Sequence, residues 1–211
     1  MLQIGGGDGG VVREVAKHAD VQEIILCELD PAVCEVSKRF FRETLARGFF
    51  DDPRVVIVHQ DGYQYVRDSK NKFDIIIVDS SDPIGPAESL FKASFFDVCR
   101  QALHPDNGIL CMQGESIWLH LDLIDGVLSS CGAVGFPSID YYTTTIPSYP
   151  GGSIGMVICS NDPYQRFQEP LRRMETLRYY NEQIHNSSFS VPQFAEDVIS
   201  NRRRSFKKRT N

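Results

Sequence analysis

Two aspartates stand three residues apart where an apolar run breaks into a turn. The stretch IIIVDSSDPIGPAE, residues 75–88, contains Asp79 and Asp82 and neither Lys nor Arg to pair with them. Desolvation at a strand end and a nearby like charge both raise the pKa of a carboxyl group, so the two should differ in basicity. We expect Asp79 to act as a base and the wetter Asp82 to hold cationic groups of a substrate. The alternative is that Asp79 only caps the turn through the backbone amides of Ser81 or Asp82.

A glycine-rich loop follows the first apolar run. In GGGDGG, residues 5–10, Gly5, Gly7 and Gly10 fit the spacing G-x-G-x-x-G. That pattern alone is weak, but here it lies between an expected strand and an expected helix. Glu28 ends the second expected strand, where it can accept both hydroxyls of a ribose. A nucleoside ligand is therefore predicted, and the alternative is a tight turn beside a surface acid.

The loop departs from a dinucleotide site at Asp8. This carboxylate stands where a pyrophosphate would lie, and the two like charges would repel. The ligand should then be a nucleoside with a cationic appendage. Asp61 and Gly62, after the third expected strand, add a carboxylate suited to an adenine amino group, although Asp61 can equally cap the helix that follows.

The elements that would position these residues alternate along the chain. Short β-branched runs predict buried parallel strands at 1–4, 24–28, 54–58, 73–79 and 108–113. Helical spacing covers 10–18, 31–46, 62–69, 94–104 and 117–130, with Asp30 and Ser94 as expected caps. An antiparallel pair is predicted at 134–144 and 152–160, and two final helices at 171–186 and 192–203. The predicted fold is an α/β, doubly wound, Rossmann-like and mainly parallel sheet with a closing antiparallel pair and C-terminal helices.

Composition fits an ordinary globular protein. The chain has 211 residues, 42% of them hydrophobic, which predicts one domain over 1–201. No apolar run is long enough to span a membrane and no signal peptide is evident, so a cytoplasmic protein is expected. The six cysteines form no metal-binding or disulfide pattern, which argues against zinc and favours buried, reduced side chains.

Charge is unevenly distributed. Residues 1–201 carry 16 basic and 28 acidic side chains, a net charge of −12, whereas 202–211 contain six basic residues and no acid. An acidic body attracts cationic ligands and repels nucleic acid, although a solvated acidic surface is equally compatible. The basic tail is expected to be a disordered, solvated end, with a nucleic-acid contact or a localisation signal as alternatives.

Six stretches of the chain together resemble the polyamine aminopropyltransferase family. They are LQIGGGDGGVVREV, CELD, QDGYQYV, DSSDPIGPAESLF, QGESIWLHLDLI and IPSYPGGSIG, which occur in the family's order between residue 2 and about 200. The resemblance implies transfer of an aminopropyl group from decarboxylated S-adenosylmethionine to putrescine, giving spermidine and methylthioadenosine. It also implies a class I methyltransferase-like fold, a cytoplasmic homodimer, and a co-substrate rather than a cofactor. Family members carry a small β-stranded domain ahead of the glycine loop, whereas residue 1 of this chain already lies in the first expected strand.

The resemblance extends the list of candidate site residues. It implies donor contacts at Gly5, Gly7, Asp8, Glu28, Asp61, Gly62, Asp79, Pro86 and Ala87. Putrescine is doubly protonated at neutral pH, so one amine must lose a proton while the other stays charged, which requires an acidic groove. Its candidates are Asp8, Asp79, Asp82, Glu115 and Tyr149. Taken alone, Glu115 could be a helix N-terminal acid and Tyr149 a surface aromatic. Trp118 and His120 fit helical core spacing, and no catalytic role is expected for His120.

Two other function classes remain open. A putrescine N-methyltransferase shares most of these motifs but must accept the methionine carboxylate that the aminopropyl donor lacks. Those methyltransferases tend to have Gln-Ala-Glu and Gly-Pro-Ala-Lys where this chain has Gln113-Gly114-Glu115 and Gly85-Pro86-Ala87-Glu88, so the resemblance favours the aminopropyl donor. A non-catalytic homologue is the third class. The choice among putrescine, spermidine and cadaverine as acceptor depends on groove length and is left open.

Overall fold

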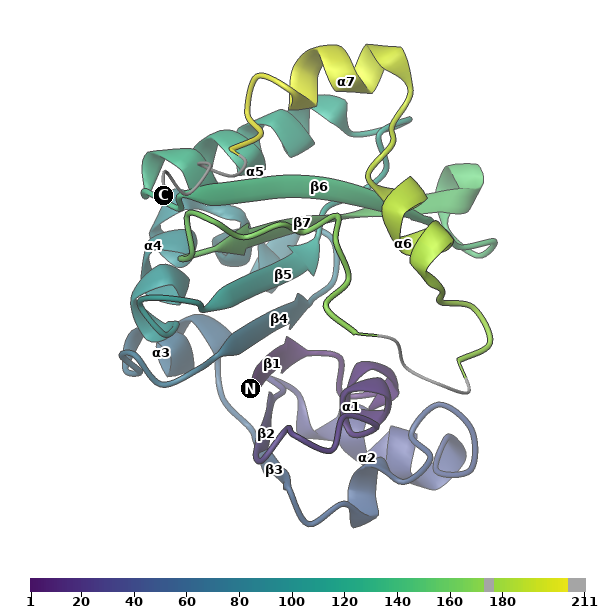
Figure 1. The fold of residues 1–211 in the computed structure, drawn as a ribbon. Coiled ribbons are helices and arrows are strands. Elements are labelled where there is room, and N and C mark those ends of the chain that lie inside the picture. Colours follow the sequence, from purple (N-terminus) through teal and green to yellow (C-terminus); the bar gives the residue numbers. More distant parts are fainter. Residues whose placement is uncertain (173–176, 205–211) are drawn as a thin grey trace. The chain divides into compact units, whose positions relative to one another are not determined.

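The computed structural model describes residues 1–172 and 177–204 (Figure 1). The chain forms two compact units, Met1–Leu110 and Cys111–Asn211.

Four parallel strands form the sheet of the first unit. They are β1 (Leu2–Gly5), β2 (Ile24–Cys27), β3 (Val55–Val58) and β4 (Ile75–Asp79). Their order is β3-β2-β1-β4, and β1 pairs in parallel with both β2 and β4. In this register Ile4 lies opposite Cys27, and Gly5 lies opposite Asp79. The segments that follow β1, β2 and β4 therefore leave the sheet at the same edge, where the parallel strands end.

Helices connect these strands. The first unit contains α1 (Gly10–Val15), α2 (Pro31–Phe40), η1 (Phe49–Asp51), α3 (Gly62–Arg67), η2 (Gly85–Phe91) and α4 (Ala93–Ala102). Asp30 caps α2 as predicted, because its Oδ1 accepts a hydrogen bond of 2.8 Å from the Ala32 amide. The prediction of Ser94 as a cap was wrong, since α4 begins at Ala93 and its N-cap residue is Lys92.

The helix α2 ends at Phe40, six residues before the predicted end. The following residues form turns that bring Ala46 and Phe49 into a buried cluster with Val12 and Leu26. Helical spacing alone indicated a longer helix, but burying these two side chains outweighs that local preference.

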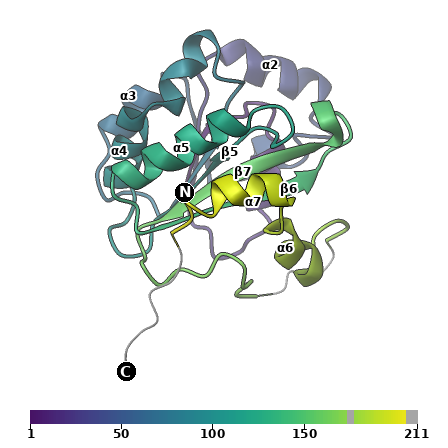
Figure 2. The ribbon, with the colours of Figure 1, turned by 90° about the horizontal axis from the view of Figure 1, so that it is seen from above.

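The second unit is built on an antiparallel pair. Strand β5 (Ile109–Gln113) carries the chain into this unit, and β6 (Ser138–Thr145) pairs with β7 (Ser153–Ser160) from Ser138 opposite Ser160 to Thr145 opposite Ser153. The helical elements are α5 (Leu121–Ala133), η3 (Pro150–Gly152), α6 (Glu182–Ser188) and α7 (Gln193–Ile199). Helix α5 packs on the pair and against α7, while α6 contacts β6 (Figures 1 and 2).

Several helix boundaries in this unit differ from the predictions. Helix α5 begins at Leu121 rather than at 117, so Trp118 and His120 lie in the preceding turn with exposed side chains. The prediction of core spacing for these two residues was wrong. Of the predicted helix 171–186, the described residues form a helix only from Glu182 onward, in α6. Residues 173–176 lie outside the described part of the chain. Helix α7 ends at Ile199 instead of 203.

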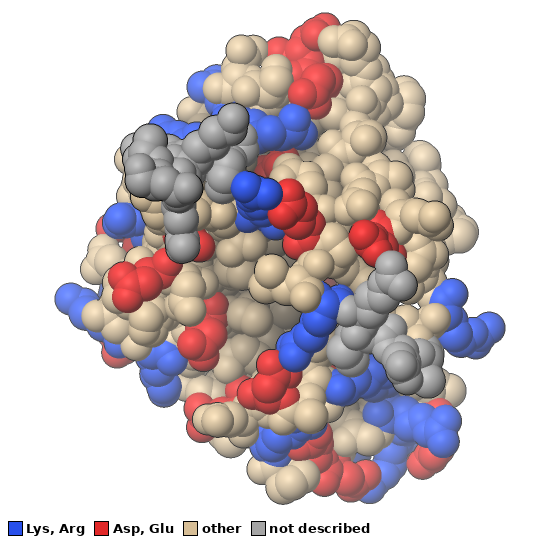
Figure 3. Space-filling model, in the orientation of Figure 1, with Lys and Arg blue, Asp and Glu red and all other residues tan. Residues whose placement is uncertain are grey.

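The cysteines agree with the prediction of reduced, mostly buried side chains. All six cysteines are free, and all except the partly exposed Cys111 are buried. Within residues 1–172 and 177–204, no helix has the length and hydropathy needed to cross a membrane. On the face drawn in Figure 3, acidic and basic side chains are interspersed.

Candidate active site

The glycine loop turns sharply after β1. Gly5 and Gly6 have φ angles of 72° and 68°, a left-handed conformation that favours glycine. A β-carbon on Gly5 would collide with the backbone of Asp79, and one on Gly6 with the Asp79 carboxylate. The loop therefore runs directly against the end of β4. Beyond it, the Asp8 carboxylate accepts a hydrogen bond of 2.7 Å from the Gly10 amide, which orients it at the start of α1.

Glu28 follows β2 and is buried, with 9% of its surface exposed. Its Oε2 accepts a hydrogen bond of 3.1 Å from the Gly7 amide, and its Oε1 one of 3.0 Å from the Asp30 amide. Each carboxylate oxygen has a further lone pair. The side chain is thus held rigidly beside the glycine loop with capacity for two ligand hydroxyls, which suits a ribose.

Asp61 and Gly62 begin α3. The Asp61 carboxylate caps the helix by accepting a hydrogen bond of 2.9 Å from the Gln64 amide, which confirms the capping role and leaves the adenine contact a prediction. That bond uses only Oδ1, and Oδ2 has no partner within the described part of the chain. A β-carbon on Gly62 would collide with the side chain of Ile4. Glycine at this position therefore allows α3 to start close above β1.

Asp79 and Asp82 occupy different environments. Asp79 ends β4 and is half-buried, whereas Asp82 lies exposed in the following turn. Burial, followed by the charges of Asp8 and Glu28, raises the pKa of the Asp79 carboxyl. Among the described residues, neither the Ser81 nor the Asp82 amide donates a hydrogen bond to that carboxylate. The geometry therefore gives the capping alternative no support.

The segment after Asp82 forms the 3-10 helix η2. Pro86 occupies its first turn and is exposed, and Ala87 is 6% exposed. Proline fits there because its fixed φ angle suits the first helical turn and its missing N–H would otherwise be unpaired.

Gln3 supports this region and was not predicted. It is fully buried in the middle of β1, and its Nε2 donates to the carbonyls of Gly5 and Gly6 at 3.2 and 3.4 Å. Its Oε1 is buried with no partner among the described residues. The signal was available in the sequence, because MLQIG places one amide in an otherwise apolar strand. Its amide satisfies two carbonyls of a loop in an unusual conformation, which fixes that loop beside Asp79.

In the second unit, Glu115 and Tyr149 contact each other. The Tyr149 hydroxyl donates a hydrogen bond to Oε2 of Glu115, a residue that is 2% exposed. The Nδ1 atom of His120 lies 3.1 Å from the same oxygen, and Gln113 Nε2 lies 3.4 Å from Oε1. The sequence predicted Glu115 and Tyr149 but not these two neighbours. His120 was missed because it was assigned to a helix that starts only after it.

The backbone around Glu115 is also fixed. Its φ angle of 60° is left-handed, which is uncommon for a residue with a side chain. Its carbonyl accepts hydrogen bonds of 2.8 Å from the Gly155 amide and from the Tyr141 hydroxyl. A β-carbon at Gly155 would collide with that hydroxyl. The position of the Glu115 carboxylate is therefore determined from both the backbone and the side chain.

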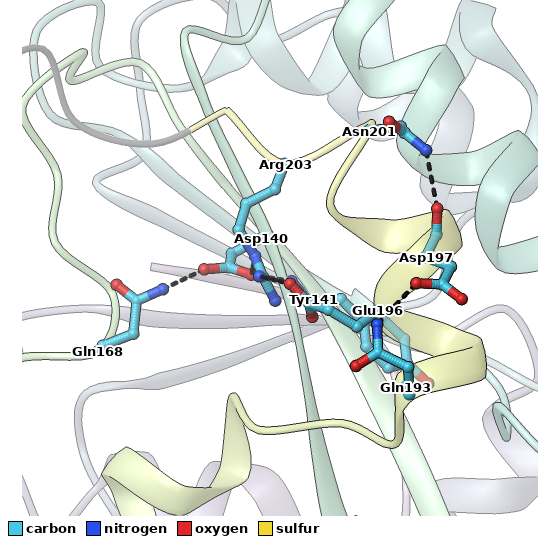
Figure 4. Close-up of polar contacts among 8 residues, drawn as sticks. All are labelled: Asp140, Tyr141, Gln168, Gln193, Glu196, Asp197, Asn201 and Arg203. Carbon is cyan, nitrogen blue, oxygen red and sulfur yellow. Dashed lines mark hydrogen bonds and ion pairs between the residues drawn. The ribbon is translucent and has the colours of Figure 1, made fainter.

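A second group of polar contacts involves the expected basic tail (Figure 4). Arg203 donates to Asp140 at 2.7 Å and to Glu196 at 2.9 Å, and Gln168 also donates to the Asp140 carboxylate. Arg202 forms an ion pair of 2.6 Å with Asp125. The structure thus departs from the predicted solvated tail at Arg202 and Arg203, because buried or partly buried acids bind their guanidinium groups. Arg204 is exposed, and its guanidinium donates a hydrogen bond of 3.3 Å to the Phe136 carbonyl. Residues 205–211 lie outside the described part.

Comparisons with known proteins agree with these features. The spermine/spermidine synthase domain matches residues 1–169. The chain belongs to the spermine/spermidine synthase family. It is 42% identical to spermidine synthase 2 of Arabidopsis thaliana, with 96% of this chain and 62% of that protein covered. It is 46% identical to the polyamine aminopropyltransferase of Leptospira biflexa, with 94% of this chain and 70% of that protein covered.

Solved structures of spermidine synthases confirm the predicted fold class. A spermidine synthase in complex with the transition-state analogue AdoDATO matches with a TM-score of 0.84 and 36% identity, covering 94% of this chain and 68% of that one. The enzyme from Thermotoga maritima matches with a TM-score of 0.82 and 35% identity, covering 94% and 67%. The chain thus spans roughly two thirds of the length of these relatives.

Proposed function

We propose that the protein transfers an aminopropyl group from decarboxylated S-adenosylmethionine to putrescine. The observation that supports this most directly is a set of carboxylates in the first unit without a basic partner. Among the described residues, Asp8, Glu28 and Asp79 form no ion pair with Lys or Arg. Like charges gathered in this way are unfavourable unless a cation binds them, and both substrates of the proposed reaction are cations.

The donor is assigned to the glycine loop and the strand ends around it. We assign the ribose to Glu28 and the adenine amino group to Asp61, whose Oδ2 has no partner among the described residues. Gly5, Gly7 and Gly62 allow the backbone to approach the nucleoside, and Pro86 and Ala87 border it in this proposal. Asp8 is assigned to the donor's ammonium group. The donor is consumed as a co-substrate, and the proposed reaction needs no further cofactor.

The chemical step needs little more than placement and one base. The lone pair of the acceptor amine attacks the carbon bonded to the sulfonium sulfur, and the C–S bond breaks. Its electron pair goes to sulfur, which becomes the neutral thioether of methylthioadenosine. The amine must be unprotonated to attack, and Asp79 is assigned as the base because burial and the charges of Asp8 and Glu28 raise the pKa of its carboxyl group. Asp82, exposed in the adjacent turn, is assigned to the acceptor's ammonium groups.

We assign Glu115 and Tyr149 to acceptor binding as well. Glu115 is a buried carboxylate with no Lys or Arg partner among the described residues, and Tyr149 fixes its orientation. Burial strengthens the attraction of a carboxylate for an ammonium group. The acidic body of the chain is compatible with a cationic substrate and unfavourable for nucleic acid. A cytoplasmic homodimer completes the proposal, on the ground of the family alone.

Donor choice provides the test. Asp8→Asn should weaken binding of decarboxylated S-adenosylmethionine by about 1 to 3 kcal/mol and weaken S-adenosylmethionine less, because only the former has an isolated ammonium group there. Glu28→Gln is the matched control, since the ribose is common to both ligands and both should lose affinity equally. Calorimetric titration of each variant with each ligand measures this, and equal losses in Asp8→Asn would contradict the assignment.

Product identity distinguishes the alternatives. Incubation with putrescine and each labelled donor in turn should give spermidine from decarboxylated S-adenosylmethionine. N-methylputrescine formed from S-adenosylmethionine would instead identify a methyltransferase. Donor binding without either product would identify a non-catalytic homologue.

A further inference from the structure

His120 and Glu115 form a pair in which one member is buried and the other is accessible. Glu115 is 2% exposed, whereas 44% of the His120 side chain is exposed. Nδ1 of His120 lies 3.1 Å from Oε2 of Glu115. The imidazole can therefore exchange protons with solvent while touching a carboxylate that solvent barely reaches.

Glu115 is not free to leave this contact. Tyr149 donates to the same Oε2, Gln113 contacts Oε1, and the carbonyl of residue 115 is held by Gly155 and Tyr141. A change in the charge of His120 is thus felt at a carboxylate that stays in place. The negative charge of the Glu115 carboxylate is balanced by His120 when the imidazole is protonated, and can bind another cation when the imidazole is neutral.

We propose that His120, when it is protonated, competes with the acceptor's ammonium group for the Glu115 carboxylate. Protonated His120 balances the carboxylate and weakens acceptor binding, whereas neutral His120 leaves the charge to the acceptor. This inference rests on the proposed function, in which Glu115 binds the acceptor. It makes His120 a positioning residue that sets how acceptor affinity changes with pH.

The direction of this dependence follows from the groups involved. An alkyl ammonium group keeps its proton up to about pH 9, whereas an imidazole ordinarily changes charge near pH 6.5. The acceptor's own charge is therefore constant between about pH 5 and 8, whereas an imidazole loses its positive charge as pH rises. Acceptor affinity should increase with pH across this interval.

The surrounding groups do not reverse this direction. Burial raises the pKa of the Tyr141 phenol above its ordinary value, so Tyr141 stays neutral in this interval. The Tyr149 hydroxyl donates a hydrogen bond to Oε2 of Glu115. Asp122 is the acidic residue in the first turn of α5. On α7, Phe194 packs against Trp118, and Glu196 is already paired with Arg203. His120 is thus the imidazole that lies directly against the Glu115 carboxylate.

Binding measured at two pH values tests the proposal. In the unaltered protein, putrescine affinity by calorimetry should rise about tenfold between about pH 5.5 and about pH 8. In His120→Gln, which keeps a hydrogen-bond donor without a titrating charge, affinity should be nearly equal at the two values. His185→Gln is the matched control and should keep the pH dependence of the unaltered protein, because the ring nitrogens of His185 contact Phe167 and Tyr180 instead of a carboxylate.

A second measurement follows the proton itself. Near pH 6.5, adding putrescine should move the imidazole carbon resonances of His120 toward the neutral form and leave those of His185 unchanged, because binding linkage is reciprocal. Putrescine that binds without moving the His120 resonances, or with one affinity at both pH values, would overturn the role of His120 alone. Putrescine that binds at neither pH would contradict the proposed function.

Discussion

Asp79 and Asp140 are two aspartates that differ in their charged neighbours although burial acts on both. Burial raises the pKa of both carboxyl groups. Asp140 receives a guanidinium from Arg203 at 2.7 Å and a backbone hydrogen bond of 2.8 Å from the Tyr141 amide. Asp79 instead faces the charges of Asp8 and Glu28, which raise its pKa further. A carboxylate that holds the fold together has its cation within the chain, whereas one kept for a ligand takes its cation from solution.

The largest effect should come from breaking the pair at Asp140. Arg203→Met keeps the aliphatic length but leaves a buried carboxylate unbalanced, so the free energy of unfolding should fall by about 3 kcal/mol at neutral pH. The loss should shrink toward low pH, where a protonated Asp140 needs no cation. Urea unfolding at several pH values measures both effects. Arg166→Met, which removes an exposed ion pair with Glu169, is the control and should cost little.

Asp79→Asn should act on turnover. Loss of the base should lower kcat by about 10²-fold or more with donor affinity largely kept. Steady-state kinetics together with donor titration checks this. A variant with normal kcat would remove Asp79 from proton transfer and reduce its comparison with Asp140 to a difference in neighbouring charges.

Asp82→Asn should have a smaller effect, mainly on the acceptor. Because Asp82 is exposed, its attraction for an ammonium group is weakened by solvent, and acceptor KM should rise several-fold with kcat little changed. The same kinetic measurements with varied putrescine decide it. If Asp82→Asn abolished turnover while Asp79→Asn only raised KM, the two roles would be reversed.

The smallest effect concerns stability at Asp79. A carboxyl group whose pKa is raised by folding costs stability as pH rises, because the unfolded chain releases the proton first. Asp79→Asn removes this cost, so the variant should gain stability relative to the unaltered protein as pH increases from about 4 toward neutrality. Thermal unfolding across this range measures the difference. A loss of stability in Asp79→Asn would mean that the carboxylate has a structural partner, as Asp140 does.

The sequence predicted best those features that local patterns determine. The strand positions, the parallel arrangement around β1 and the antiparallel pair followed from β-branched runs and breakers. The contrast between a half-buried Asp79 and an exposed Asp82 followed from their places at a strand end and in a turn. Asp61 as a cap was likewise visible in its position just before a helix.

What the sequence did not predict depends on contacts between distant residues. The end of α2 depends on burial of Ala46 and Phe49 against Val12, more than thirty residues earlier. The contact of Arg203 with Asp140 joins residues 63 positions apart, and periodicity says nothing about such pairs. His120 was missed for a local reason. The predicted start of α5 was four residues too early, so His120 was assigned to the helix and interpreted as a core residue.

The left-handed backbone of Glu115 has a consequence for directed evolution. A residue with a side chain at φ near 60° costs of order 1 kcal/mol relative to glycine, and asparagine also tolerates this conformation. In a library selected for thermal resistance alone, position 115 is therefore where Gly or Asn should accumulate early. In a library selected for polyamine production, the same position should keep its acid.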